Sequence, residues 1–145
     1  MKAVNQIKLT FPSQSTNEGF ARTAVAAFLV PLDPTVEELS DIKVAVSEAV
    51  TNCIVHAYPD TIGTVTLTAA YDETRTVRIR VRDAGRGIED IALAMTPAYS
   101  TLGGERAGLG FAVMESFMDA VRVRSQPGKG TAVTMKKRLI GRVKA

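Results

Sequence analysis

Two alternating runs near the middle of the chain give the clearest pattern of hydrophobic and polar positions. Residues 64–71 (TVTLTAAY) and 76–83 (TVRIRVRD) carry apolar side chains at every second position, which is typical of half-buried β-strands. Because only residues 72–75 separate the two runs, we expect a β-hairpin. Residues 4–11 alternate in part and predict another strand.

Helical spacing of apolar residues replaces this alternation in two earlier segments. Residues 18–29 form the first segment, which ends before Pro31. The second segment has a stronger start signal, because Thr35 and Glu38 fit a capping box, in which each side chain bonds to the backbone of the other residue. Its helical pattern continues to about Ala57.

The last part of the chain has a less regular pattern. Residues 84–110 are rich in glycine without a sustained period, residues 111–118 predict a short helix, and residues 119–126 and 131–139 predict a second hairpin. This order predicts an α+β fold: a two-layer sandwich with helices on one face of a mixed, mostly antiparallel sheet. We expect residues 1–145 to form one domain.

Composition narrows the class of protein without identifying a function. The 145 residues are 46% hydrophobic, which supports a packed core, and 18 basic against 15 acidic residues give a net charge of only +3. A single cysteine, Cys53, excludes an intramolecular disulfide and a multi-cysteine metal site. No apolar run approaches the length of about 18 residues that a membrane helix needs, and the first residues do not form a signal peptide. We therefore expect a cytoplasmic protein.

Arginines alternate with valine and isoleucine in both predicted hairpins. One row contains Arg78, Arg80 and Arg82, and the other contains Arg122 and Arg124. A solvated or partner-facing sheet surface explains both rows. Nucleic-acid binding is the alternative, but no aromatic residues that could stack on bases are interleaved with these arginines.

Three polar residues follow one another at intervals of four in the second helical segment: Glu48, Asn52 and His56. Residues four apart are neighbours on a helix surface. They lie beside an apolar stripe, so they form either a solvated edge or a set of polar groups facing one ligand. The helix alone leaves both interpretations open.

Two glycine motifs follow. Asp83 ends a predicted strand and precedes Gly85 and Gly87, whose backbone can approach a ligand closely, and its carboxylate can accept a hydrogen bond from an amino group such as that of adenine. Residues 103–111 (GGERAGLGF) lead glycines into a helix, and free N–H groups at a helix N-terminus bind phosphate. A plain turn would also explain the first motif, and a flexible lid would explain the second. Neither motif is a P-loop.

Taken in order, these motifs resemble the GHKL superfamily of ATP-binding proteins, which includes gyrase, chaperone, histidine-kinase and mismatch-repair ATPases. The segment from Glu48 through Asn52 to His56 is similar to that of the anti-sigma factor serine kinases of spore-forming bacteria. Similarity to these kinases extends over nearly the whole chain and includes the segments Phe20-Ala-Arg22, Leu32-Asp-Pro-Thr35, Gly108-Leu-Gly-Phe111 and residues 114–119.

The resemblance implies a role for each central residue. Glu48 would be the general base that accepts the proton of a serine hydroxyl, and Asn52 would coordinate Mg²⁺. Asp83 would recognise adenine, with Gly85 and Gly87 closing around it. Beyond these, the hydroxyl of Thr131 would support adenine recognition, and Arg22 would belong to a surface that binds protein partners.

The remaining nucleotide contacts would come from a lid at about residues 89–110, in which Leu102 stands where related lids often have a basic residue. Arg106 would neutralise γ-phosphate charge, and the backbone of Gly108 and Gly110 would approach the phosphates. The other residues of the lid that the resemblance assigns to the nucleotide are Ser100, Thr101 and Leu109.

The implied activity is that of an ATP-dependent protein serine kinase that also acts as an anti-sigma factor. It would bind ATP or ADP with Mg²⁺ and use ATP to phosphorylate a serine of an anti-anti-sigma factor. It would also bind a sporulation sigma factor and work as a homodimer without contacting nucleic acid or membrane. Three alternatives stay open: a general-stress anti-sigma kinase, a nucleotide-gated sigma-binding module without kinase activity, and a basic nucleic-acid binder.

Overall fold

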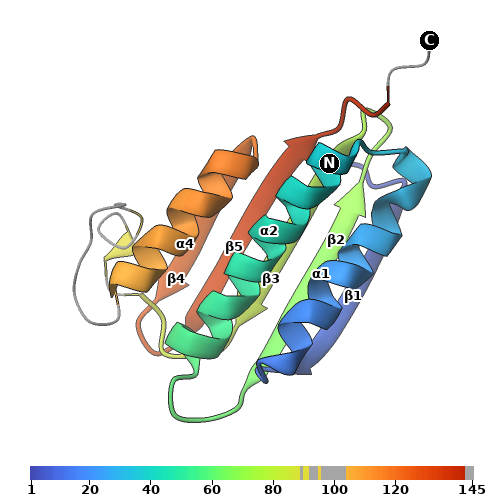
Figure 1. Ribbon diagram of the computed structural model, residues 1–145. Coiled ribbons are helices and arrows are strands. Elements are labelled where there is room, and N and C mark those ends of the chain that lie inside the picture. Colours follow the sequence, from blue (N-terminus) through green and yellow to red (C-terminus); the bar gives the residue numbers. More distant parts are fainter. Residues whose placement is uncertain (89, 92–94, 96–103, 143–145) are drawn as a thin grey trace.

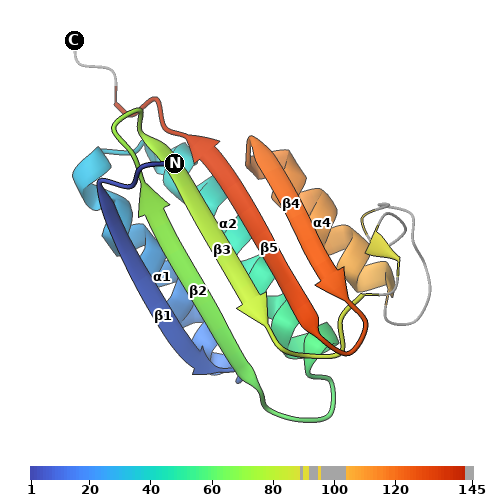
Figure 2. The same ribbon diagram turned by 180° about the vertical axis from the view of Figure 1, so that it is seen from behind.

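The molecule is built from one five-stranded sheet and helices that cover one of its faces (Figures 1 and 2). The computed structural model describes residues 1–88, 90, 91, 95 and 104–142, with only the backbone for 104–109. Figure 2 shows the opposite face of the sheet, which no helix covers in the described part of the chain. These two layers confirm the α+β sandwich expected from the sequence.

The strands lie in the order β1-β2-β3-β5-β4. All four pairings between the described strands are antiparallel, so the parallel pairing that a mixed sheet would include is not found among them. The β2–β3 hairpin has the predicted bounds, whereas the first strand starts and ends one residue later than expected. The strands are β1 (Asn5–Pro12), β2 (Thr64–Tyr71), β3 (Thr76–Asp83), β4 (Ala120–Gln126) and β5 (Gly130–Arg138).

Among the described residues, three α-helices cover the sheet: α1 (Thr16–Leu29), α2 (Val36–Asn52) and α4 (Gly104–Phe117), with α2 in the middle (Figure 1). A short 3₁₀ helix, η1 (Val30–Leu32), follows α1. The predicted end of the second helix changes character, since residues Cys53–Ala57 form a π-helical turn, η2. Such turns are rare and concentrate at functional sites.

The prediction that the last helix begins at Phe111 is wrong, because α4 begins at Gly104. Gly108 and Gly110 therefore lie inside this helix and not in front of it. Each glycine costs a helix only about 1 kcal/mol relative to alanine. That cost is small enough for packing of α4 against α2 to outweigh it.

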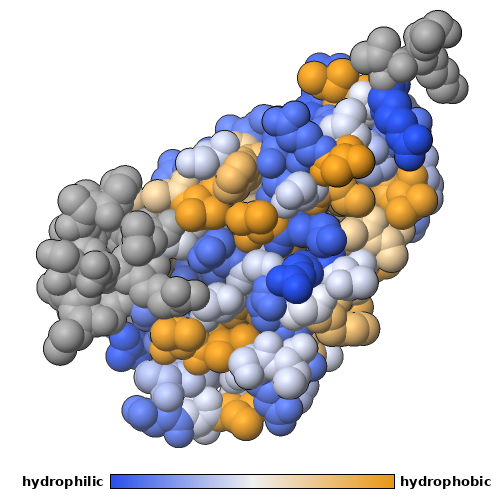
Figure 3. All heavy atoms as spheres, viewed as in Figure 1, coloured by the Kyte–Doolittle hydropathy of each residue, from blue (hydrophilic) through white to orange (hydrophobic). Residues whose placement is uncertain are grey.

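The core lies between the sheet and the helices. The apolar face of α2 is fully buried through Ile42, Val46 and Val50. It packs against the inward side chains of the sheet, such as Leu67 and Ile79, which are also fully buried. Apolar and polar residues alternate in small groups on the outside of the helix layer (Figure 3). Among the described residues, no helix has the length and apolar character needed to span a bilayer.

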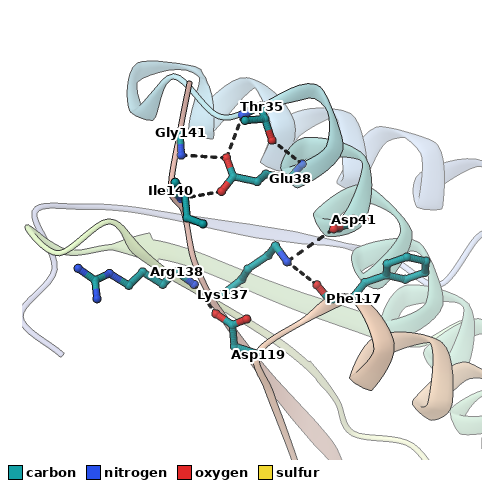
Figure 4. Close-up of polar contacts among 9 residues, drawn as sticks. All are labelled: Thr35, Glu38, Asp41, Phe117, Asp119, Lys137, Arg138, Ile140 and Gly141. Carbon is teal, nitrogen blue, oxygen red and sulfur yellow. Dashed lines mark hydrogen bonds and ion pairs between the residues drawn. The ribbon is translucent and has the colours of Figure 1, made fainter. Parts of the chain in front are cut away.

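Glu38 joins the start of α2 to the segment that follows β5 (Figure 4). Its Oε1 accepts hydrogen bonds from the backbone N–H groups of Thr35 (2.9 Å) and Gly141 (3.1 Å), and its Oε2 accepts one from Ile140 (2.6 Å). Thr35 Oγ1 completes the predicted capping box by accepting the N–H of Glu38 at 3.0 Å. Burial acts to raise the pKa of Glu38, but these hydrogen bonds outweigh it and lower the pKa.

We predict that Glu38→Gln lowers the free energy of unfolding by about 1–2 kcal/mol at neutral pH, because an amide cannot accept on both sides. A carboxyl whose pKa is lowered by folding stabilises the protein above its ordinary pKa, and this contribution disappears as the pH falls through the lowered value. Urea unfolding as a function of pH should therefore show the two proteins converging in acid. Glu37→Gln, on the exposed side of the same turn, is the control, and an equal loss in both variants would contradict the prediction.

Candidate functional site

Asp83 is the centre of a polar cluster at the end of β3. The residue is only 8% exposed. Its Oδ1 accepts hydrogen bonds from the N–H of Gly85 at 2.9 Å and from the N–H of Thr131, on the neighbouring strand β5, at 3.2 Å. Its Oδ2 receives a hydrogen bond from Cys53 Sγ at 3.5 Å. Two backbone donors thus fix one oxygen, and the other has only a weak thiol donor.

Burial raises the pKa of Asp83, against the opposing effect of the hydrogen bonds from Gly85, Cys53 and Thr131. Burial also raises the pKa of the Cys53 thiol, and the nearby Asp83 carboxylate adds to this rise. The thiol is therefore protonated at neutral pH and acts as a donor. Asp83 Oδ2 keeps acceptor capacity for an amino group of a ligand, as the sequence predicts for adenine recognition.

The two loops beside Asp83 approach each other at glycines. Gly87 (φ 76°) and Gly130 (φ 96°) have positive φ, which favours glycine. A side chain at Gly130 would overlap the backbone of Asp83 and Ala84, and one at Gly85 would overlap the carbonyl group of Ala57. At these glycines backbone lies against backbone, and contact of Gly85 and Gly87 with a nucleotide stays a prediction.

Hydrogen bonds tie these loops to the π-helical turn. The N–H of Arg86 donates to Ala57 O at 3.2 Å, and the N–H of Ala84 donates to the Tyr58 hydroxyl at 2.7 Å. The Tyr58 hydroxyl in turn donates to Thr64 O at 2.9 Å. The end of η2 therefore sets the position of the chain that follows Asp83.

Thr131 is also held through its hydroxyl. Thr131 Oγ1 and Ser125 Oγ lie 2.8 Å apart, and the Ser125 hydroxyl donates to Gly130 O at 2.9 Å. Ser125 Oγ also accepts the N–H of Ile88 at 2.8 Å. The predicted adenine-supporting hydroxyl thus belongs to a network that reaches the loop after Asp83.

Glu48 and Asn52 form a second polar group on the side of α2 that faces α4. Both side chains are half-buried. A methyl group in place of the Gly110 hydrogen would lie 3.1 Å from Asn52 Oδ1 and 3.2 Å from Glu48 Oε2. The two polar ends therefore converge on one point above Gly110, as their spacing on one helix predicts. His56 lies beyond them on the π-helical turn, where the regular helical spacing no longer holds.

The donor set fits a magnesium ion that is held mainly by phosphates. Asn52 Nδ2 is buried and has no hydrogen-bond partner within the described part of the chain, so this amide N–H group can donate to an external acceptor such as a phosphate oxygen. Among the described residues, no group of three or more histidines, cysteines and acidic residues could hold a metal. Mg²⁺ commonly takes one or two protein oxygens with phosphates and water, and the amide oxygen of Asn52 meets that need.

The structure leaves most predicted lid residues undecided. Ser100 and Thr101 lie outside the described residues, and Arg106, Gly108 and Leu109 are described only through their backbone in α4. Their contacts to a nucleotide stay predictions. Within a helix, only the first four N–H groups lack a helical partner, so Gly108 and Gly110 could bind phosphate through the backbone only if α4 began later than it does here.

Arg22 lies apart from these groups. It is exposed on α1 and forms a salt bridge with Glu18 at 3.0 Å, and Figure 1 shows α1 on the opposite side of α2 from α4. Sequence reasoning missed the part that Tyr58 and Ser125 play and took Cys53 for a core residue only. Cys53 and Tyr58 lie in the same segment as Glu48 and Asn52, and this position was the one signal in the sequence that could have identified them as site residues. Nothing in the sequence singles out Ser125.

Comparisons with known proteins show the family to which this fold belongs. The family described as histidine kinase-like ATPase domain matches residues 11–137. The solved structure of the RsbU and RsbW domains of a Mycobacterium tuberculosis protein is similar in fold, with a TM-score of 0.70 over 98% of this chain, 35% of that chain and 21% identity. A histidine kinase domain from Erythrobacter litoralis has a TM-score of 0.56 over 96% of this chain and 65% of that chain, at 23% identity. The family match shows that the chain belongs to the histidine kinase-like ATPase domain family, and the two structures have the same fold.

Curated relatives narrow the class. The anti-sigma F factor of Caldanaerobacter subterraneus subsp. tengcongensis is 55% identical over 143 residues, 98% of this chain and 99% of that protein. The anti-sigma F factor of Clostridium acetobutylicum is 51% identical over 135 residues, 92% and 94% of the two chains. The chain therefore belongs to the anti-sigma F factor family. This confirms the sequence-based expectation of an anti-sigma factor with a GHKL-type fold.

We predict that Gly130→Ala lowers the free energy of unfolding by about 1–3 kcal/mol more than Gly128→Ala does. Both glycines lie in the same turn with positive φ, 75° for Gly128 and 96° for Gly130, so both variants incur a similar backbone strain. Only a side chain at Gly130 meets the Asp83 backbone, because Gly128 has open space around it. Urea unfolding measures the difference, and equal losses would contradict the close approach.

Proposed function

We propose that this chain binds ATP with Mg²⁺, phosphorylates a serine of an anti-anti-sigma factor, and holds a sporulation sigma factor away from RNA polymerase. The observation that carries the proposal is the convergence of Glu48 and Asn52 on α2 at the same end of the fold as the buried Asp83. In this arrangement one end of a nucleotide would bind at Asp83 and its phosphates would extend toward α4.

Asp83 would accept the exocyclic amino group of adenine through Oδ2, the oxygen without a backbone donor. A guanine base presents a carbonyl group at the corresponding position, and a carboxylate would repel it. Thr131 and Ser125 would keep the carboxylate in place through their connected hydrogen bonds. Buried carboxylates that are ionised and held by fixed donors make directional acceptors.

Glu48 would act as the general base in phosphoryl transfer. The serine oxygen of the substrate protein would form a bond to the γ-phosphorus while the bond from that phosphorus to the β-γ bridging oxygen breaks, and Glu48 would take the serine proton. ADP and phosphoserine would be the products. Asn52 would hold Mg²⁺ through its amide oxygen, and the ion would supply charge stabilisation for the transferred group.

Arg22 would contribute to a surface on α1 on which the sigma factor and the anti-anti-sigma factor compete. Its exposure and its location away from Asp83 and Glu48 support a role in binding a protein and not a nucleotide. We further propose a homodimer that works in the cytoplasm. Incubation with labelled ATP, Mg²⁺ and the anti-anti-sigma protein of the same organism, followed by mapping of the labelled residue, tests the proposal directly.

We predict that Asp83→Asn weakens ATP binding about 10- to 100-fold, because an amide nitrogen or a weaker amide acceptor replaces a charged acceptor. Isothermal titration calorimetry with ATP and Mg²⁺ measures the change. Asp60→Asn, the same substitution in an exposed turn, should bind as the native chain does. Undiminished ATP affinity of the Asp83 variant would remove the adenine assignment.

We predict that Glu48→Gln leaves ATP affinity within about threefold of the native value while serine phosphorylation slows about 10²- to 10⁴-fold, the range that general-base catalysis contributes. Single-turnover transfer of labelled phosphate measures the rate, with Glu73→Gln in the β2–β3 turn as the control. Rapid transfer by the Glu48 variant would exclude this residue as the base. If the native chain and the Glu48 variant both bind ATP and the sigma factor but neither transfers phosphate, the nucleotide-gated binding module is the correct alternative.

A further inference from the structure

The uncovered face of the sheet carries a basic depression that the nucleotide site does not use. The depression has a volume of about 570 Å³. Its walls are two columns of arginines on the strands that flank β5, and its floor is formed by residues of β5, of which Ala132 and Thr134 are small. We call it the arginine trough, and it is lined by Arg78 and Arg80 of β3, Arg122 and Arg124 of β4, and Ala132, Thr134 and Lys136 of β5.

The strand register explains the shape of the trough. Arg80 pairs with Thr134, which pairs on its other side with Arg122, so a short side chain lies between two long basic ones. Neighbouring strands lie about 4.8 Å apart, which places the two arginine columns about 10 Å apart. Along each column, the arginines follow one another every second residue, about 6.6–6.8 Å apart.

The charge of this face is uncompensated. None of the five basic side chains that line the trough forms a salt bridge within the described part of the chain. The outward positions of the five strands include no carboxylate that could neutralise them. A chain with a net charge of only +3 therefore concentrates positive charge on one face and its acidic residues elsewhere.

We infer that the arginine trough binds an extended, acidic segment of a protein partner. Alternate side chains of an extended peptide lie about 6.6–6.8 Å apart, and this distance matches the spacing of the arginines along each column. Guanidinium groups pair with carboxylates through two parallel hydrogen bonds, and the fork geometry favours such pairs over contacts with single charges. An α-helix, about 10–12 Å wide with its side chains, is too broad to enter between the columns.

Two other occupants fit the face less well. A second copy of the chain that presented the same surface would oppose cations with cations, which disfavours a symmetric contact here. Single-stranded nucleic acid usually needs aromatic side chains on which bases stack, and none lies at the outward positions of the described strands. The acidic polypeptide is therefore the occupant that both charge and spacing favour.

The test uses the full chain and a fluorescein-labelled peptide of alternating glutamate and threonine, with anisotropy as the readout. We expect binding that weakens as salt rises, because exposed charges are screened. Arg80→Gln/Arg122→Gln should weaken binding about tenfold or more, and Arg80→Glu/Arg122→Glu should abolish it. Lys2→Gln/Lys43→Gln removes the same charge outside the trough and should bind like the native chain. Thermal unfolding checks that all variants are folded.

Three outcomes would overturn the inference: no binding of the peptide, an equal loss in the Lys2/Lys43 control, or tighter binding of an oligothymidylate that also depends on Arg80 and Arg122. Loss of self-association in the Arg80/Arg122 variant, measured by sedimentation, would also overturn it and assign the face to a second copy. Asp83→Asn should leave peptide binding unchanged. The inference about the arginine trough and the assignment of the nucleotide site can therefore be refuted separately.

Discussion

The packing of α2 on the sheet is the constraint on which the rest of the molecule depends. This helix lies between α1 and α4 and buries one continuous apolar stripe, so its rotation about its own axis is fixed. With that rotation fixed, Glu48 and Asn52 can only face α4, and Cys53 can only point down toward the end of β3. The hydrophobic effect thus orients polar groups that contribute nothing to the core.

Two carboxylates at opposite ends of α2 have opposite effects on folding. Glu38 is stabilised in its ionised form by three backbone donors. Asp83 has a raised pKa, so its ionised form opposes folding, and that opposition lessens as the pH falls through the raised value. A buried charge that lowers the stability of the fold departs from the rules that favour folding, and proteins make such departures mainly at functional sites. Ionised Asp83 therefore costs the fold stability at the candidate site, whereas ionised Glu38 stabilises the other end of α2.

The sequence predicts the regular elements well where a local signal exists. The β2–β3 hairpin follows from strict alternation, and the capping box follows from Thr35 and Glu38. The start of α4 could not be predicted, because two glycines weaken the local helical signal while contact with α2 favours the helix. The surroundings of Asp83 were equally hidden, since its partners Cys53 and Thr131 lie 30 and 48 residues away. Local patterns define elements, whereas partners distant in the sequence define the site.

The π-helical turn at Cys53–Ala57 determines what a change in chain length would do at this point of the fold. A π turn holds one residue more than an α turn, so losing any one residue of this stretch would let it relax into an ordinary helix. Tyr58 closes this turn by donating its N–H to Cys53 O at 3.1 Å, and with one residue fewer the same bond would close an α turn. Tyr58 would therefore stay on its side of the helix, and its hydroxyl would keep its bonds to Ala84 and Thr64. The π turn therefore absorbs one residue of chain length without displacing the contacts that follow it.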